Sequence, residues 1–184
     1  MKETAWRSTR PKSRSGETIA FLATDGATRL DLSVAGGSTP TPPSEPTASV
    51  GRASLPLSET GVVSEAVTVR TGGGAGSLTV AEGTRARDKD GNPLGEVTVA
   101  RSDAPGIPQA PPGTAIGFAL DCGPAGATFD PPATLTYALS VEEWAKIGSA
   151  TPKVMWYNPG TGEWQEVPAT VDAATRTVTA QVSH

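Results

Sequence analysis

Three aromatic residues in the last third of the chain are the first candidates for binding chemistry. Trp156 and Tyr157 are consecutive, and Trp164 follows the turn sequence Asn-Pro-Gly-Thr-Gly-Glu at 158–163. Flat rings on two strands joined by such a turn could form a platform on which sugar rings stack. The same rings are ordinary stabilisers of sandwich cores and of neighbouring strands. The carbohydrate hypothesis therefore requires these tryptophans to be accessible.

Nucleophilic catalysis requires a base beside a nucleophile, and the chain has one histidine, His184, and one cysteine. Ser183 precedes His184, but neighbours on a strand point to opposite faces, so we do not expect this pair to work as a catalytic couple. One His and one Cys also argue against a Cys/His zinc site and a disulfide framework. We expect no catalytic residue, no cofactor-binding residue and no metal site.

Two further clusters match known ligand sites only in part. Asp88, Asp90 and Asn92 carry the alternating oxygen atoms that open a calcium loop, but the twelfth position, which needs a bidentate Glu, is Val99. The glycine-rich run 71–76 lacks the Gly-Lys-Ser/Thr ending of a phosphate-binding loop. We interpret both segments as turns between strands.

The charge of the chain argues against nucleic-acid binding. Its 184 residues include 15 Lys and Arg against 19 Asp and Glu, a net charge of −4, which does not suit a surface that neutralises phosphates. No run approaches the roughly 20 apolar residues of a membrane span. The first 14 residues differ from the rest, with five Lys or Arg and one Glu. We expect residues 1–16 to form a disordered basic arm.

Residues 17–35 predict a β-hairpin. Ile19, Phe21 and Ala23 alternate with small or polar residues, and Asp25-Gly26 supplies the turn. A two-stranded hairpin is marginal by itself, so it either packs on another element or ends a preceding domain. The prolines within 36–49 predict a semi-rigid linker.

Residues 50–184 predict an antiparallel β-sandwich. Short segments of period-two alternation are separated by turn signals at a spacing of roughly 8–12 residues, which is typical of sandwiches. In one of these segments Ile116, Phe118, Leu120 and Cys122 are expected to share a face.

One short helix is predicted near 141–147. Ser140 and Glu143 have the spacing of a capping box, in which each side chain satisfies a backbone N–H of the other residue. Trp144 and Ile147 are then expected to face the core, and Gly148 to end the helix.

The segment Gly-Pro-Ala-Gly-Ala-Thr-Phe-Asp-Pro-Pro-Ala-Thr-Leu-Thr at 123–136, with Ser-Leu-Thr-Val-Ala-Glu-Gly-Thr at 77–84 and the closing hairpin 157–164, resembles the ZU-five domain. The resemblance covers about residues 60–184 and is greatest to modules of predicted surface proteins of methanogenic archaea. ZU-five domains are β-sandwiches that serve as structural or protein-interaction modules. In this stretch the glycines permit a tight turn, and Phe129 is expected to plug one end of the sandwich.

The resemblance implies a non-enzymatic module of an exported or cell-surface protein, whose partner is another protein or a neighbouring domain. A subset of the family cleaves its own chain at His-Phe-Ser. Here only His184 matches that motif, so self-cleavage needs a Phe-Ser beyond this sequence. An autoproteolytic module and a carbohydrate-binding module that uses Trp156, Tyr157 and Trp164 are the alternatives.

Overall fold

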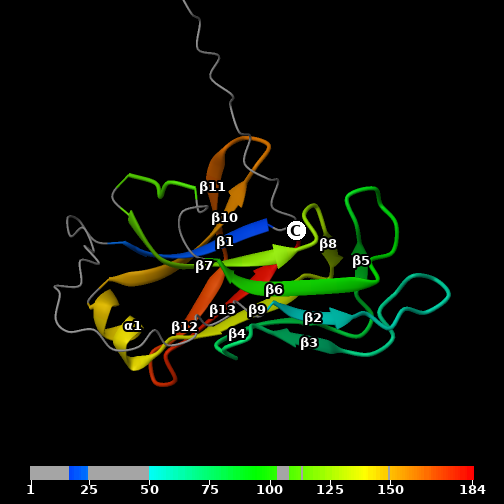
Figure 1. Ribbon diagram of the computed structural model, residues 1–184, viewed down its shortest axis with the longest axis horizontal. Coiled ribbons are helices and arrows are strands. Elements are labelled where there is room, and N and C mark those ends of the chain that lie inside the picture. Colours follow the sequence, from blue (N-terminus) through cyan, green and yellow to red (C-terminus); the bar gives the residue numbers. More distant parts are fainter. Residues whose placement is uncertain (1–16, 25–49, 103–107, 113, 149) are drawn as a thin grey trace, which may run out of the picture.

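The computed structural model describes residues 17–24, 50–102, 108–112, 114–148 and 150–184. Within them lie thirteen strands and one short helix, and most of the strands form two stacked antiparallel sheets (Figure 1). This confirms the predicted all-β fold with a single short helix. The predicted basic arm at 1–16 and linker at 36–49 lie outside the described residues.

The larger sheet has six strands in the order β11–β10–β1–β7–β6–β2. Their bounds are β1 Glu17–Thr24, β2 Gly51–Ser54, β6 Glu96–Ser102, β7 Thr114–Gly123, β10 Thr151–Asn158 and β11 Glu163–Val167. β11 leads through Pro168 into the second sheet, so proline, which cannot donate to a ladder, occupies the corner between them.

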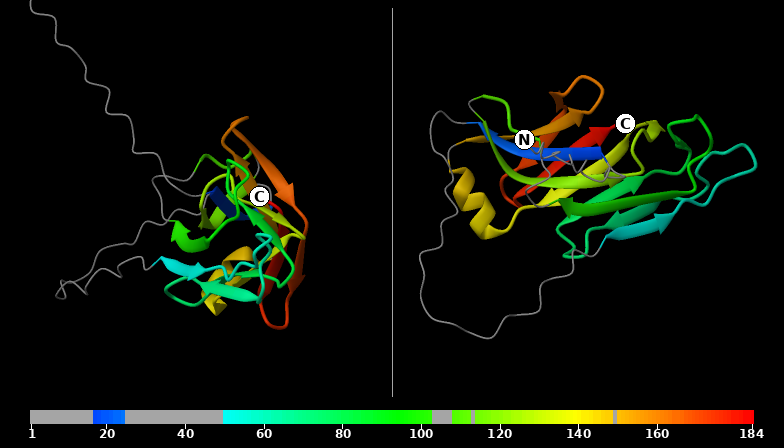
Figure 2. Two further views of the ribbon diagram at one scale, coloured as in Figure 1. Left: turned by 90° about the vertical axis from the view of Figure 1, so that its right-hand side faces the viewer. Right: turned by 45° about the horizontal axis from the view of Figure 1, so that its top comes forward.

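The second sheet has five strands in the order β12–β13–β9–β4–β3, and Figure 2 shows the two sheets face to face. The bounds of its strands are β3 Val67–Arg70, β4 Gly76–Val80, β9 Ala133–Ala138, β12 Ala169–Asp172 and β13 Thr177–Val182. β5 (Arg85–Arg87) and β8 (Thr128–Asp130) pair separately as a small third sheet.

The N-terminal strand β1 lies near the middle of the larger sheet. It pairs antiparallel with β10 from Ile19 to Thr24 and with β7 from Glu17 to Thr24. The predicted sandwich began at residue 50. The sheet instead includes β1, a strand that precedes this boundary. The predicted return strand of the 17–35 hairpin lies outside the described residues, and the partners of β1 lie about 100 residues away in β7 and about 130 residues away in β10.

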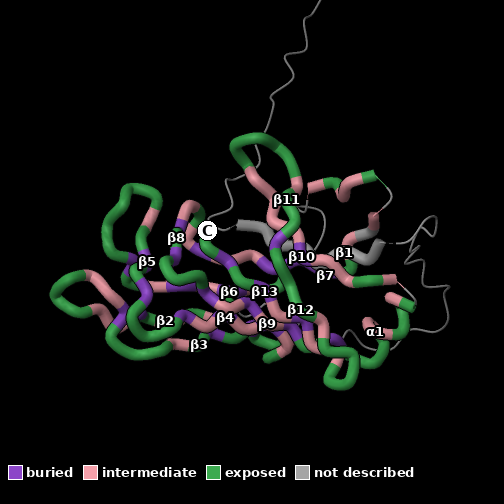
Figure 3. Tube along the Cα trace, turned by 180° about the vertical axis from the view of Figure 1, so that it is seen from behind, coloured by how far each residue is buried: buried purple, intermediate pink, exposed green. Residues whose placement is uncertain are grey.

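Side chains from both sheets fill the space between them. Figure 3 shows buried positions concentrated between the sheets and exposed positions in the connecting loops. The largest fully buried side chains are Tyr137, Leu78, Leu120, Leu135, Val63, Val80, Val97, Val99, Val154 and Val178. Phe129 is also buried in this core, as its predicted role at one end of the sandwich requires.

A β-bulge in β7 changes which residues share a face. Phe21 of β1 pairs with Phe118, but the next residue, Leu22, pairs with Ile116, so Gly117 is the extra residue. Phe118 and Leu120 face the core between the sheets, whereas Ile116 packs with Ala119 on the outer face. The expectation that Ile116 shares a face with Phe118 is wrong, because the bulge reverses the alternation at this point.

The helix α1 (Val141–Ile147) begins and ends as predicted. The Ser140 side chain accepts a hydrogen bond from the Glu143 backbone N–H (3.1 Å), and the Glu143 carboxylate accepts one from the Ser140 N–H (2.8 Å). Trp144 and Ile147 pack against the core, and Gly148 ends the helix with a φ of 59°. No helix within the described ranges has the length and apolar character needed to cross a membrane.

Candidate functional site

The three predicted stacking residues do not lie on one face. In β10, Val154 and Trp156 point toward the core, whereas Met155 contacts the outer face of the sheet. Tyr157 pairs with Trp164 of β11, and their rings make an edge contact at 5.3 Å with an interplanar angle of 63°. The structure therefore brings Tyr157 and Trp164 together on one side and places Trp156 on the other.

Trp164 belongs to a small apolar cluster on the outer face of the larger sheet. The cluster consists of Ala110, Ile116, Ala119, Met155 and Trp164. The indole N–H of Trp164 donates to the carbonyl oxygen of Gln109 at 2.8 Å, which fastens the segment 108–112 over the sheet. The indole N–H of Trp164 is thus used within the fold. The Tyr157 ring is inclined to the Trp164 ring, so the two rings do not form a flat platform.

His184 packs against Trp156. Their ring centres are 3.9 Å apart at an interplanar angle of 61°, and Trp156 Nε1 is buried without a hydrogen-bond partner among the described residues. The Ser183 hydroxyl lies 3.1 Å from His184 Nδ1. This contact corrects the expectation that the two side chains point apart, because β13 ends at Val182 and the strand alternation ends with it.

The cavity beside His184 is too small for a ligand. Its walls are formed by Leu78, Cys122, Gly123, Pro124, Ala127, Phe129, Val182 and His184. The volume of about 10 Å³ corresponds to a single water molecule. Phe129 also donates its backbone N–H to the Ser183 carbonyl oxygen at 2.9 Å, so this end of the chain is part of the packed sandwich.

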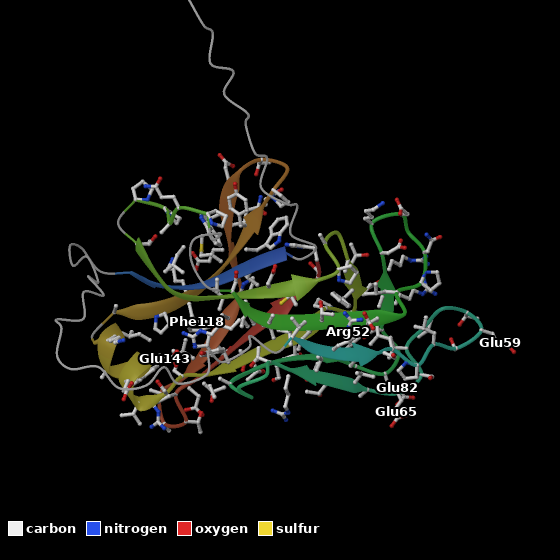
Figure 4. The ribbon with its side chains drawn as sticks, in the orientation of Figure 1. Arg52, Glu59, Glu65, Glu82, Phe118 and Glu143 are labelled. Atoms are coloured by element: carbon white, nitrogen blue, oxygen red, sulfur yellow. The ribbon has the colours of Figure 1, made fainter. Side chains whose placement is uncertain are left out.

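A polar network that the sequence did not reveal joins both sheets to α1. Arg101 of β6 donates to the Tyr137 hydroxyl (2.9 Å) and to the Glu143 carboxylate (3.1 Å), and Tyr137 donates to Glu143 (3.2 Å). The Tyr137 ring stacks on Phe118 with ring centres 3.7 Å apart. Figure 4 shows Phe118 and Glu143 close together at the α1 end of the sandwich.

Two pKa values follow from this network. Burial raises the pKa of Tyr137 to about 12; the positive charge of Arg101 opposes the rise, and Glu143 reinforces it. Partial burial raises the pKa of Glu143, but hydrogen bonds from Ser140, Arg101 and Tyr137 outweigh it and leave this pKa below its ordinary value. The network therefore holds Glu143 as a carboxylate that stabilises the fold.

An open groove with a volume of about 750 Å³ lies on the outer face of β2, β6 and β7. Its floor includes Thr98 and Ala100, and one wall is the loop between β5 and β6. Six charged side chains line it: Arg52, Asp88, Lys89, Asp90, Glu96 and Asp121. Figure 4 shows Arg52 on this part of the sheet.

The Asp88 segment forms one wall of the groove and is built as a turn. The Asp88 carboxylate accepts hydrogen bonds from the backbone N–H groups of Asp90 (2.9 Å) and Asn92 (2.8 Å), and these bonds lower its pKa. Lys89 pairs with Asp90 at 2.7 Å. The Asp88 oxygen atoms are thus engaged in holding a turn between strands, as the sequence predicted for this segment.

The sequence does not predict the groove, because the residues that line it come from segments that are distant in sequence. The one local signal was the Gly-Pro-Ala sequence at 123–125, which closes the groove beside Asp121. Comparisons of the chain with protein-family models, with curated proteins and with solved structures give no match.

Proposed function

We propose that this chain is a structural or protein-interaction β-sandwich module of an exported or cell-surface protein, without catalytic activity of its own. The observation that carries the proposal is the open groove on the outer face of β2, β6 and β7. In this proposal the groove receives a segment of another protein or of a neighbouring domain.

The lining of the groove suits a polypeptide. Charges of both signs stand around a floor of small side chains, and Val50, an apolar residue that is 55% exposed, lies at its margin. A peptide backbone can lie on such a floor, while the surrounding side chains select its sequence. Pro93 and Pro124 add rigid apolar surface to the walls.

The ZU-five resemblance supports the same assignment. Gly123, Pro124 and Ala125 begin the most specific part of that resemblance, and all three line the groove. Gly126, which follows, has a φ of 78°, and a Cβ added there would lie 2.7 Å from the Lys89 Cβ. The motif thus shapes the contact between the β7 end and the Asp88 turn.

Selection from a displayed peptide library on the immobilised full chain tests the proposal. Selected peptides are then titrated against the variants Ala100→Trp, which fills the groove floor, and Thr170→Trp, which adds the same ring to the exposed edge strand β12. Denaturation midpoints of both variants establish that each is folded.

We expect selected peptides to bind the wild-type chain and Thr170→Trp equally and to lose binding to Ala100→Trp. Binding that survives in Ala100→Trp, or a selection that enriches no peptide, would contradict a groove-based interaction function. Enrichment of peptides that bind only through Tyr157 and Trp164 would contradict it as well.

A further inference from the structure

The groove has an excess of negative charge. Two of its six charged side chains are cationic, Arg52 and Lys89, and the other four are carboxylates. Arg52 pairs with Glu96 at 3.3 Å and Lys89 with Asp90 at 2.7 Å; the side chains of Arg52, Lys89 and Asp90 are largely exposed to water, and that of Glu96 is about half exposed. Exposed pairs of this kind exchange partners at little cost. A basic segment can therefore enter the groove and share its carboxylates.

The chain itself carries such a segment directly before β1. Residues 2–14 contain Lys2, Arg7, Arg10, Lys12 and Arg14 against the single acidic residue Glu3, a charge of +4. The remaining residues carry −8, because the whole chain carries −4. The largest local charge contrast in the sequence thus lies between this segment and the rest of the chain.

The register of the sheet places the start of β1 level with the β6 part of the groove. Glu17, the first residue of β1, pairs with Cys122, and Cys122 pairs with Val99 of β6. β1 and β6 run in the same direction along the sheet, because each is antiparallel to β7. Glu96 lies three residues before Val99, and Arg14 lies three residues before Glu17.

The distances are short enough for direct contact. Three residues at strand pitch span about 10 Å, so a chain continuing from Glu17 can bring Arg14 level with Glu96. Two strand spacings, about 10 Å, separate β1 from β6, and the long Arg and Lys side chains cover much of this gap. On the same extended path Lys12 would come level with Leu94, which follows the Asp88 turn and lines the groove.

We infer that the groove is occupied by residues 2–14 of the same chain, with Lys12 and Arg14 on its carboxylates. The inference rests on the proposed function, since it names the occupant of the same groove. The occupant is then a covalently attached basic peptide that an external polypeptide must displace. Attachment close to the groove gives it an effective concentration of about millimolar.

Zero-length carbodiimide cross-linking of the full chain tests this, because it joins a lysine amine to a carboxylate only when the two are in contact. An equimolar mixture of unlabelled and ¹⁵N-labelled chain separates links within one copy from links between copies by mass. Glu59, Glu65 and Glu82 serve as reference carboxylates, since all three are exposed and none of them lines the groove; Figure 4 shows them at the end of the sandwich opposite α1. The link between Lys89 and Asp90 reports that the reagent works.

We expect Lys12 to be linked within one copy to Asp88, Asp90, Glu96 or Asp121, and not to the reference carboxylates. The yield should fall several-fold between 0.1 M and 1 M salt, where the screening length shortens from about 10 Å to about 3 Å. A Lys12→Arg variant, which keeps the charge but lacks the reactive amine, should lose these links.

Links spread evenly over the reference carboxylates, or a yield that is insensitive to salt, would overturn the inference. Links found only between copies would overturn it in favour of a second chain as the occupant. If library peptides bind at Ala100 but Lys12 forms no link to the groove, residues 2–14 are not the occupant, and the proposed function stands. If no peptide binds and Lys12 forms no link to the groove, the inference and the proposed function are both refuted.

Discussion

Removing β1 should abolish the folded state, whereas removing the sequence before it should not. β1 makes six registered pairs with β10 and eight with β7. An antiparallel ladder supplies on average one backbone hydrogen bond per registered pair, so about fourteen are lost. At about 0.5–1.5 kcal/mol each, the loss is about 7–21 kcal/mol. A whole domain is stable by only about 5–15 kcal/mol.

The assay is urea denaturation followed by tryptophan fluorescence. A chain lacking residues 1–24 is compared with one lacking residues 1–16, and both keep the same three tryptophans, Trp144, Trp156 and Trp164. We expect a cooperative transition for the chain lacking 1–16 and none for the chain lacking 1–24. Similar midpoints for the two chains would refute the placement of β1 between β7 and β10.

Three further predictions concern single side chains. Gly51→Ala should destabilise the fold by about 1–3 kcal/mol or more in urea denaturation, because the new Cβ would lie 1.8 Å from a backbone oxygen of β3. Gly73→Ala, with nothing within 4 Å, is its control and should change stability by less than about 0.5 kcal/mol. Trp164→Phe should cost about 1 kcal/mol in urea denaturation, since it removes the hydrogen bond from the indole N–H to the Gln109 carbonyl oxygen; unchanged stability would contradict this. Glu143 has a lowered pKa, so its stabilisation is present above its unfolded pKa and is lost as pH falls through the folded pKa; the stability difference between wild type and Glu143→Gln should shrink from pH 7 to about pH 3, and a constant difference would count against the network.

Local signals in the sequence predicted local structure well. The capping box at Ser140 and Glu143 placed the helix within a residue of its ends, because both partners of each hydrogen bond lie in the same turn. Gly126 and Phe129 also lie as the turn chemistry and the apolar pattern required. In each of these cases the atoms that decide the conformation lie within a few residues of one another.

The errors arose where distant segments decide the outcome. β1 reads as one half of a hairpin, but its partners are β7 and β10, which no short-range pattern indicates. The bulge at Gly117 reversed the alternation of β7, and so Ile116 lies on the outer face. The separation of Trp156 from Tyr157 is the exception, because it follows from local strand alternation: successive residues of a strand point to opposite faces.

The candidate site was hidden for the same reason. The groove collects residues from β2, the Asp88 turn, β6 and the end of β7, and its charges have meaning only once these segments are adjacent. Glu143 was recognised as a capping residue, but its bonds to Arg101 and Tyr137 depend on the packing of α1 against two strands.

A chemical-shift map of the ¹⁵N-labelled full chain, recorded while a library-selected peptide is added, tests the central claim most directly. If the groove is the interaction surface, the largest amide shifts will occur at Thr98, Ala100 and Asp121, on the outer face of β6 and β7. Largest shifts at Tyr157 and Trp164, or at α1, would place the interaction elsewhere and contradict the account.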